Sequence, residues 1–419
     1  MKSQIRLIFI LFVSFILLVD GIAFAGLAGD FPAILHPTVI AGFWLITLVV
    51  IVRLAVYGRT FISNSKPGFF AGFYVFTGFF LALYVPKLFF IAFLALEFVL
   101  KLLVFAFLGL ADHPVPFGEF LWNGPLNIVS MLIIPLSIFS LMVIFWGMLF
   151  GRFNFKVRRT EISFPDLPPA FDGYRIIHIS DLHLGSLHGN QDKLERAIQL
   201  INNESPDLVL FTGDLVNNLA EETIGWETLL AGINAADGNY AILGNHDYGE
   251  YYDWPDEEAH RDNMQKLIRA HEESGFTLLL NRSVMISRKN ENIFLAGVEN
   301  WGLPPFKQYG DLEKALQQIP ESGFTILLSH DPSHWDEEVK GHTGVHLTLS
   351  GHTHGMQFGI RKGKFRWSPI QLKYPRWVGL YKQGFQYLHV NPGLGYIGYA
   401  GRIWIPPEIS LFILRKSIS

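Results

Sequence analysis

Cysteine is absent from this chain of 419 residues. Its absence excludes a disulfide scaffold, a zinc–thiolate site and a cysteine nucleophile. The redox compartment stays open, because a chain without cysteine suits either side of a membrane. An excess of positive charge is also missing, since the formal net charge is -4. Nucleic acid is therefore not an expected partner.

Charged residues are scarce in the first part of the chain. Residues 1–150 hold 12 Lys, Arg, Asp and Glu residues, whereas the other 269 residues hold 58. Phenylalanine has the opposite bias, with 24 of its 37 copies in the first 150 positions. This contrast predicts a transmembrane helical region at 1–150, a linker at 151–172 and a soluble domain at 173–419.

Four apolar segments are candidates for membrane spans. They are Ile5–Val19 with an apolar continuation to Ala28, Val39–Val56, Phe69–Leu110 and Leu126–Phe150. The first could instead be a signal peptide cleaved after Ala23-Phe24-Ala25, but its apolar length favours an uncleaved span. The third is too long for one span and awkward for two, so four or five transmembrane helices are expected.

The flanking charges predict the orientation of the spans. Lys and Arg gather at the N-terminus, in 53–66 and in 152–159, whereas 29–37 and 111–125 contain none. By the positive-inside rule, the N-terminus and the soluble domain lie in the cytoplasm if 69–110 crosses once. If that segment crosses twice, the domain emerges outside.

Three ionisable residues lie inside the apolar region: Asp20, Lys87 and Glu97. Such groups are costly in lipid. We expect them either to pair or line a cavity, or to reach the interface or pack within the bundle.

The soluble region alternates short β-branched runs with polar clusters. The runs are Tyr174–Ile179, Asp207–Phe211, Tyr240–Leu243, Phe324–Leu328 and Val345–Leu349. Apolar residues at helical spacing predict an amphipathic helix at Gln191–Asn203. Strands that alternate with helices indicate an α/β domain, in which ligands gather beyond the carboxyl ends of the strands.

The polar clusters contain residue types that bind metal ions. Candidate ligands are Asp181, His183, Asp214, Asn245, His330, His352 and His354. Carboxylate, amide and imidazole ligands suit Mn, Fe, Zn, Co or Ni. Seven ligands are too many for one zinc ion but fit two ions about 4 Å apart with a bridging carboxylate. Such a centre activates water and clamps phosphoryl oxygens, which makes a phosphate ester the natural substrate.

In order and spacing, these clusters resemble the calcineurin-like metallophosphoesterase superfamily. Its pattern D-x-H, G-D, G-N-H-[DE], H, G-H-x-H is matched by Asp181-Leu-His183, Gly213-Asp214, Gly244-Asn-His-Asp247, His330 and Gly351-His-Thr-His354. The resemblance covers roughly Tyr174 to Arg415. It implies an α/β/β/α sandwich of two mixed sheets, here preceded by an all-α transmembrane bundle.

The same resemblance implies a role for each residue. One metal ion is held by Asp181, His183, Asp214 and His354. The other is held by the bridging Asp214 with Asn245, His330 and His352. His246 is implied to be a catalytic residue that donates to the phosphoryl oxygens or protonates the leaving group. Asp247 is implied to orient His246.

The tail from Asn391 to Ile409 also resembles bacterial, membrane-attached members of the superfamily. Some relatives in this subgroup cleave the lipid precursor UDP-2,3-diacylglucosamine. The expected function is therefore hydrolysis of a phosphoester or pyrophosphate bond in a lipid-linked substrate, with two divalent metal ions, Mn first among them, at the bacterial cytoplasmic membrane. The alternatives are a phosphatase or phosphodiesterase for soluble substrates that is merely tethered to the membrane, and a non-catalytic sensor or scaffold.

Two further segments bear on substrate choice. Residues 248–275 are aromatic and acidic, and they form either a lid over the site or a surface helix with an aromatic base. Arg361 to Lys382 interleaves basic residues with Trp and Tyr. This stretch suits an anionic membrane surface or a lipid headgroup, or else it is a solvated hairpin.

Overall fold

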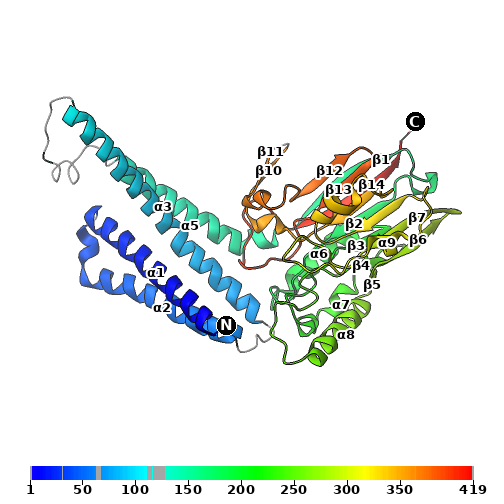
Figure 1. The fold of residues 1–419 in the computed structure, drawn as a ribbon, viewed down its shortest axis with the longest axis horizontal. Coiled ribbons are helices and arrows are strands. Elements are labelled where there is room, and N and C mark those ends of the chain that lie inside the picture. The colour runs from blue at the N-terminus through cyan, green and yellow to red at the C-terminus, as the bar shows by residue number, and fades with distance from the viewer. Residues whose placement is uncertain are drawn as a thin grey trace. The chain divides into compact units, whose positions relative to one another are not determined.

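The computed structural model describes residues 2–30, 32–62, 68–110, 116, 128–363 and 365–417. Five residues that the sequence analysis used for flanking charges, for the start of the last span or for the basic stretch lie outside these ranges: Lys66, Asp112, Glu119, Leu126 and Lys364. The chain divides into two compact units (Figure 1). The first comprises Met1–Ser63 and Phe76–Phe145, and the second comprises Asn64–Val75 and Trp146–Ser419.

The first unit is built from long apolar helices. The long helices of the chain are α1 (Lys2–Asp30), α2 (Pro37–Ile62), α3 (Phe69–Leu110) and α5 (Ile128–Leu149), and the short helix η1 spans Pro32–Leu35. Within the described residues, four helices are long and apolar enough to cross a membrane. This confirms the expected apolar helical region and favours four helices over five.

Helix α3 explains the segment that was too long for one span. It is a single helix of 42 residues, about 60 Å at the usual rise per residue, or twice the thickness of a bilayer core. Its first two turns, 69–75, belong to the second unit, where Phe70 and Tyr74 are buried in the core of the soluble domain. About 10 Å of the helix is therefore part of the soluble domain, and the rest, about 50 Å, is still longer than one bilayer core is thick.

The three ionisable residues inside the apolar region, Asp20, Lys87 and Glu97, are paired. Asp20 is fully buried, and its carboxylate accepts hydrogen bonds from Thr47 Oγ1 at 2.5 Å and from Tyr84 OH at 2.9 Å. Lys87 Nζ lies 2.5 Å from the other carboxylate oxygen. Glu97 forms an ion pair with Lys101 four residues along the helix. Of the alternatives considered from the sequence, these groups therefore follow the one in which they pair.

The second unit contains all the strands. They are β1 (Lys156–Phe164), β2 (Arg175–Ile179), β3 (Leu208–Phe211), β4 (Asn239–Ala241), β5 (Thr277–Leu278), β6 (Arg282–Arg288), β7 (Glu291–Gly297), β8 (Thr325–Leu328), β9 (Leu347–Ser350), β10 (Ile360–Lys362), β11 (Phe365–Trp367), β12 (Gly379–Gln383), β13 (Gln386–Val390) and β14 (Glu408–Lys416). Its helices are α6 (Gln191–Asn203), α7 (Glu227–Leu230), α8 (Glu257–Glu273) and α9 (Leu312–Leu316), with short turns η2 (Gly151–Phe153), η3 (Pro169–Phe171), η4 (Ala220–Thr223), η5 (Trp335–Val339), η6 (His354–Gln357) and η7 (Pro369–Leu372).

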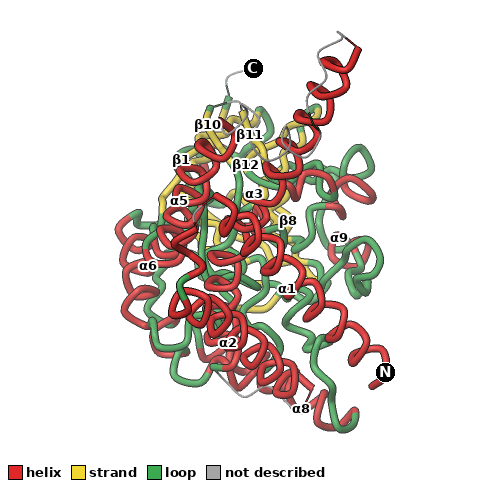
Figure 2. Tube along the Cα trace, turned by 90° about the vertical axis from the view of Figure 1, so that its left-hand side faces the viewer, coloured by secondary structure: helices red, strands yellow, loops and turns green. Residues whose placement is uncertain are grey.

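The strands form two mixed six-stranded sheets and one separate hairpin. The first sheet has the order β1-β14-β2-β3-β4-β5, and the second has the order β12-β13-β9-β8-β7-β6. Strands β2, β3 and β4 run parallel to one another, as do β7, β8 and β9. Figure 2 distinguishes the strands of the chain, in yellow, from its helices, in red.

Alternating side chains divide the soluble unit into layers. In β3, Leu208 and Leu210 join the core between the two sheets, whereas Val209 and Phe211 face the core beneath α6. A third cluster covers the outer face of the second sheet with α9 and Trp335. The layers are thus helix, sheet, sheet and helix, which confirms the predicted α/β/β/α sandwich.

Candidate metal centre

The carboxyl ends of neighbouring strands carry the predicted ligands. Asp181 lies two residues after β2, and Asp214 lies three residues after β3. His330 and His352 each lie two residues after β8 and β9, respectively. Because parallel strands end at the same edge of a sheet, each sheet brings its polar side chains together.

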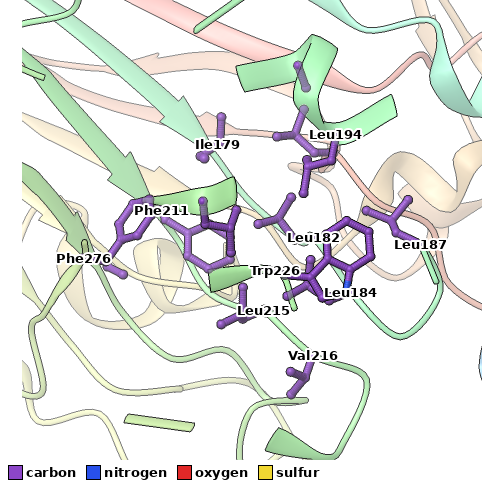
Figure 3. Packing of buried hydrophobic residues seen from close by; sticks show 14 of the residues in the cluster. Ile179, Leu182, Leu184, Leu187, Leu194, Phe211, Leu215, Val216, Trp226 and Phe276 are labelled. Atoms are coloured by element: carbon purple, nitrogen blue, oxygen red, sulfur yellow. The ribbon is translucent and has the colours of Figure 1, made fainter. Parts of the chain in front are cut away.

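Buried leucines and a valine hold the loops that follow β2 and β3. Leu182 lies between Asp181 and His183 and is buried in the core beside α6. Leu215 and Val216, which follow Asp214, enter the same core (Figure 3). The ligand loops are therefore fixed by apolar packing and not only by contacts among the polar residues.

The backbone is strained where the ligands lie. Five of the seven predicted ligands have positive φ: Asp181, His183, Asp214, His352 and His354. This conformation is uncommon for residues other than glycine and costs of order 1–3 kcal/mol each. The surrounding packing must supply this energy, and such strain is typical of functional sites.

The predicted ligands form two groups that share one carboxylate. The first contains Asp181, His183, Asp214 and His354, and the second contains Asp214, His330 and His352. Within each group the candidate ligand atoms lie within 4.8 Å of one another. Asn245 joins the second group, because its Oδ1 lies 2.8 Å from His352 Nδ1. The structure thus brings all seven residues together.

The chemistry of the ring nitrogens fits bound cations. His330 Nδ1 lies 2.6 Å from the carbonyl oxygen of Thr212 and donates to it, so Nε2 of the neutral ring carries a lone pair. That nitrogen lies 3.2 Å from a carboxylate oxygen of Asp214, and unless the nitrogen is protonated the two acceptors repel each other. His183 Nε2 similarly lies 3.0 Å from His354 Nε2. Divalent cations between these atoms would remove the repulsion.

The electrostatics of the cluster support the same conclusion. Burial and the neighbouring Asp214 raise the pKa of Asp181 to about 7. Burial lowers the pKa of His330, but Asp214 and Asp181 outweigh it and raise that pKa to about 10. Burial lowers the pKa of His183 to about 3. Protons on His330 and Asp181 thus occupy places that a cation would take, and a bound metal ion would release them.

Two motif glycines are required by close approach. A Cβ atom on Gly244 would lie 2.3 Å from Oδ1 of Asp214. A Cβ atom on Gly351 would lie 2.3 Å from Oδ2 of Asp181. Each glycine therefore lets a loop from one strand approach a carboxylate from another strand, which explains why the motifs contain glycine at these positions.

His246 lies at the edge of the cluster. Its backbone N–H donates to Asp214 Oδ1 at 2.9 Å, and its Nδ1 lies 2.7 Å from the carbonyl oxygen of Asn217. The Nδ1–H group therefore donates to that carbonyl, and Nε2 is the nitrogen left for a substrate.

The role implied for Asp247 needs correction. Its carboxylate accepts hydrogen bonds from the backbone N–H groups of Asp214 and Gly244 at 2.8 and 2.9 Å, and of Leu215 and Val216 at 2.8 and 3.3 Å. Asp247 thus fixes the loop that carries Asp214. The ring of His246 is instead oriented by Asn217, whose backbone carbonyl left no signal in the sequence.

Two side chains that the motif did not include contact His352. Its Nε2 lies 2.8 Å from Tyr374 OH and 3.5 Å from Asp331 Oδ2. These contacts leave Nδ1, the atom beside Asn245, to face the cluster. Asp331 directly follows the motif residue His330, so its position was a usable signal. Tyr374 comes from a distant segment and was not identifiable.

The segment 248–275 has features of both alternatives proposed for it. Helix α8 buries Leu267 and Ala270 in the core, and Tyr248 stacks on Tyr309 at 4.3 Å between ring centroids. This packing matches a surface helix with an aromatic base. Tyr251, however, reaches the cluster, where its OH lies 2.8 Å from Asn245 Nδ2.

The known proteins that this chain resembles in sequence are metallophosphoesterases. The sequence profile of the family described as Calcineurin-like phosphoesterase matches residues 174–356. "Transmembrane protein with metallophosphoesterase domain" of Danio rerio is 29% identical over 269 residues, which is 62% of this chain and 58% of that protein. This chain thus matches less than two thirds of that relative.

Bacterial proteins match as well. "Uncharacterized metallophosphoesterase YkuE" of Bacillus subtilis is 32% identical over 258 residues, covering 60% of this chain and 82% of that protein. The solved structure of a phosphopantetheinyl hydrolase from Mycobacterium tuberculosis covers 52% of this chain and 96% of its own, with a TM-score of 0.29 and 13% identity.

Proposed function

The chain belongs to the calcineurin-like metallophosphoesterase family, and from this premise we propose that it is a metal-dependent hydrolase of phosphoric esters that acts on a lipid-linked phosphoester or pyrophosphate at a membrane. The observation that carries the proposal is the convergence of six other ligand side chains around Asp214, in a chain whose described residues also include four helices able to cross a membrane.

The proposed centre holds two divalent ions. Asp181, His183, Asp214 and His354 would bind one ion, and Asp214, Asn245, His330 and His352 would bind the other. When bound, the ions activate water and withdraw negative charge from a phosphoryl group. We propose Mn as the resident metal, because the mixed set of carboxylate, amide and imidazole ligands suits it, although the same set accommodates Fe, Zn, Co or Ni.

His246 is the proposed catalytic residue outside the ligand set. Since Nδ1–H donates to the carbonyl of Asn217, the ring is held with Nε2 directed away from that contact. From there it would hydrogen-bond a phosphoryl oxygen or give a proton to the leaving group. Asp247 acts at one remove, by holding the loop that places Asp214.

The membrane helices support a substrate that resides in or near the bilayer. Anchoring a hydrolase beside a membrane raises its effective concentration toward amphipathic substrates. A nucleotide-linked lipid such as UDP-2,3-diacylglucosamine has the required pyrophosphate and acyl chains. The basic residues that flank the apolar segments support placing the soluble domain on the cytoplasmic side of a bacterial cytoplasmic membrane.

The test is hydrolysis by the full chain purified in detergent with Mn(II). UDP-2,3-diacylglucosamine and bis-p-nitrophenyl phosphate are compared, with Asp214→Asn as the control for contaminating enzymes. Preference for the lipid nucleotide is expected. Hydrolysis of the generic diester alone would contradict the lipid-linked substrate, and no Asp214-dependent hydrolysis of either compound would contradict the enzymatic function.

A further inference from the structure

The hairpin β10–β11 exposes apolar side chains. Ile360 pairs with Trp367 across the hairpin, and Lys362 pairs with Phe365, so these four side chains lie on one face. Phe365 is 61% exposed, and Ile360 and Trp367 are each 39% exposed. Figure 1 shows the hairpin apart from the two large sheets. A small hairpin with an apolar outer face is unexpected in water.

The other face of the hairpin is charged and points toward the domain. Arg361 Nη1 lies 2.5 Å from Glu408 Oε2, and Arg366 Nη1 donates to the carbonyl of Val378 at 2.9 Å. These inward contacts fix which face is outermost. The polarity of the hairpin is thus the reverse of a solvated one, in which arginines would face water and aromatic rings would face the core.

Segments next to the hairpin in the structure or the chain add further exposed apolar side chains. Phe358 lies 6.0 Å from Trp367 between ring centroids and pairs with Ile403 in a β-bridge. Trp404, the next residue, is 47% exposed, and Leu372 in η7 is 91% exposed. We define the hairpin surface as Phe358, Ile360, Phe365, Trp367, Leu372 and Trp404.

Basic residues predominate in the sequence around the hairpin surface. Residues 339–407 contain nine Lys and Arg residues and no Asp or Glu. Lys362 and Lys373 are exposed beside the apolar side chains. Exposed aromatic and aliphatic groups with basic neighbours fit the interface of a membrane that contains anionic lipids.

The base of the hairpin is tied to the end of a candidate membrane span. Helix α5 ends in the soluble unit, where Gly147 O accepts a hydrogen bond from Arg402 N at 3.1 Å. The next residue, Ile403, accepts a hydrogen bond from Gly359 N at 3.2 Å, one residue before β10. The hairpin therefore lies close to the point where the chain leaves the apolar helix.

The hairpin is also close to the metal centre in the chain. His354, a predicted ligand, begins η6, and Phe358 follows this turn directly. Ser368, just after β11, donates from Oγ to the carbonyl of Gly355 at 3.0 Å. Phe358 of the hairpin surface is thus only four residues along the chain from the proposed ligand His354.

We propose that the hairpin surface is seated in the anionic leaflet of the lipid bilayer and holds the metal centre at the level of the headgroups. The proposal rests on the proposed function for its consequence, which is access to phosphoesters of lipids. The seating itself depends only on the apolar face, the basic neighbours and the link to α5.

The absence of cysteine permits a direct test in the full chain. A polarity-sensitive fluorophore is attached to Phe365→Cys, and to Leu372→Cys as a second variant, after reconstitution into vesicles of phosphatidylglycerol and phosphatidylethanolamine. Met285→Cys on β6 is the matched control, because Met285 is 57% exposed in the same unit. Quenching is measured with aqueous iodide and with bromine-labelled acyl chains.

The proposal predicts that labels at 365 and 372 lose iodide quenching and gain quenching by brominated chains, whereas the label at 285 shows the reverse. Equal iodide quenching at all three positions would overturn it. Shielding from both quenchers would also overturn it, since a second copy of the chain would then cover the surface. If the labels at 365 and 372 showed the same quenching in vesicles of neutral phosphatidylcholine, the preference of the hairpin surface for anionic lipids would be refuted.

A second arm separates this proposal from the proposed function. Phe365→Glu should hydrolyse bis-p-nitrophenyl phosphate like the unmodified chain but lose hydrolysis of UDP-2,3-diacylglucosamine in vesicles, whereas Met285→Glu should lose neither. Equal lipid hydrolysis by the two variants would contradict the role of the hairpin. Because quenching needs no substrate, an inactive chain would refute the proposed function and leave the seating result valid.

Discussion

Two buried carboxylates, one in each unit of the chain, have opposite surroundings. Asp20 in the helical unit is surrounded by donors: a hydroxyl, a phenol and an ammonium group. Asp214 in the soluble unit lies near imidazole nitrogens, with His330 Nε2 at 3.2 Å and His183 Nε2 at 3.6 Å. Both of those rings use their Nδ1 on a backbone carbonyl.

The difference separates a structural site from a ligand site. The Asp20 cluster is complete, because its acceptors and donors match within the protein. The Asp214 cluster has an excess of acceptors when His330 is neutral, and His330 Nε2 is then buried without a hydrogen-bond donor among the described residues. An excess of converging acceptors is what a cation requires, and nothing comparable surrounds Asp20.

Replacing Asp214 by Asn should produce the largest effect. The variant loses the bridging charge, so metal content and activity should fall together, with hydrolysis of bis-p-nitrophenyl phosphate reduced about 10³-fold or more, or roughly 4 kcal/mol. Metal analysis and initial rates measure both. Asp262→Asn on α8, whose carboxylate pairs with Lys266 at the surface, is the control. Full metal content in Asp214→Asn would show that Asp214 is not a metal ligand and would contradict the distinction drawn between the Asp20 and Asp214 clusters.

His246→Ala should separate catalysis from metal binding. The ring lies beside the cluster but is outside the predicted ligand set, so the variant should keep both ions and lose about 10²-fold in turnover. His342→Ala, at an exposed histidine, should change neither quantity. A loss of metal in His246→Ala would show that this ring is a ligand.

The affinity for Mn(II) should depend on pH. Because the pKa of Asp181 is raised to about 7 and that of His330 to about 10, the metal must displace one proton between these values and two below pH 7. As the pH is lowered, the affinity should therefore fall about tenfold per pH unit from pH 10 to pH 7, and more steeply below pH 7. Competition with a chelating dye from pH 8.5 to 5.5 measures how the logarithm of the Mn(II) affinity changes with pH. The same slope above and below pH 7 would contradict the prediction.

The smallest effect is expected in the helical unit. Asp20→Leu leaves the ammonium of Lys87 without its carboxylate and should destabilise the helices by about 1–3 kcal/mol. Adding Lys87→Met should restore most of that stability, because the unmatched donor is also removed. Thermal unfolding in detergent tests this, with the metal content of the soluble unit unchanged. A double variant as unstable as Asp20→Leu would contradict the pairing.

Sequence alone predicted which side chains would converge. Apolar runs that stop at Ser180, Thr212 and Ser329 identify buried strands, and parallel strands necessarily bring their carboxyl ends to one edge. The glycines beside Asn245 and His352 are explained by the same geometry, since a Cβ atom would overlap a carboxylate.

Other features could not be predicted, for physical reasons. The carbonyl of Asn217 orients His246, but a backbone carbonyl has no side-chain signature. Asp247 contacts four backbone amides, a role that depends on loop shape and not on residue type. The division of α3 between two units was also hidden, because Phe70 and Tyr74 are equally compatible with lipid and with a protein core.

The most direct test of a dinuclear site is the number of metal ions in the active full chain. After loading with Mn(II) and removal of free metal, the chain should retain two ions, and EDTA should abolish hydrolysis of bis-p-nitrophenyl phosphate until Mn(II) is returned. Retention of no metal, or of one ion at full activity, or activity that survives complete removal of metal, would contradict the account.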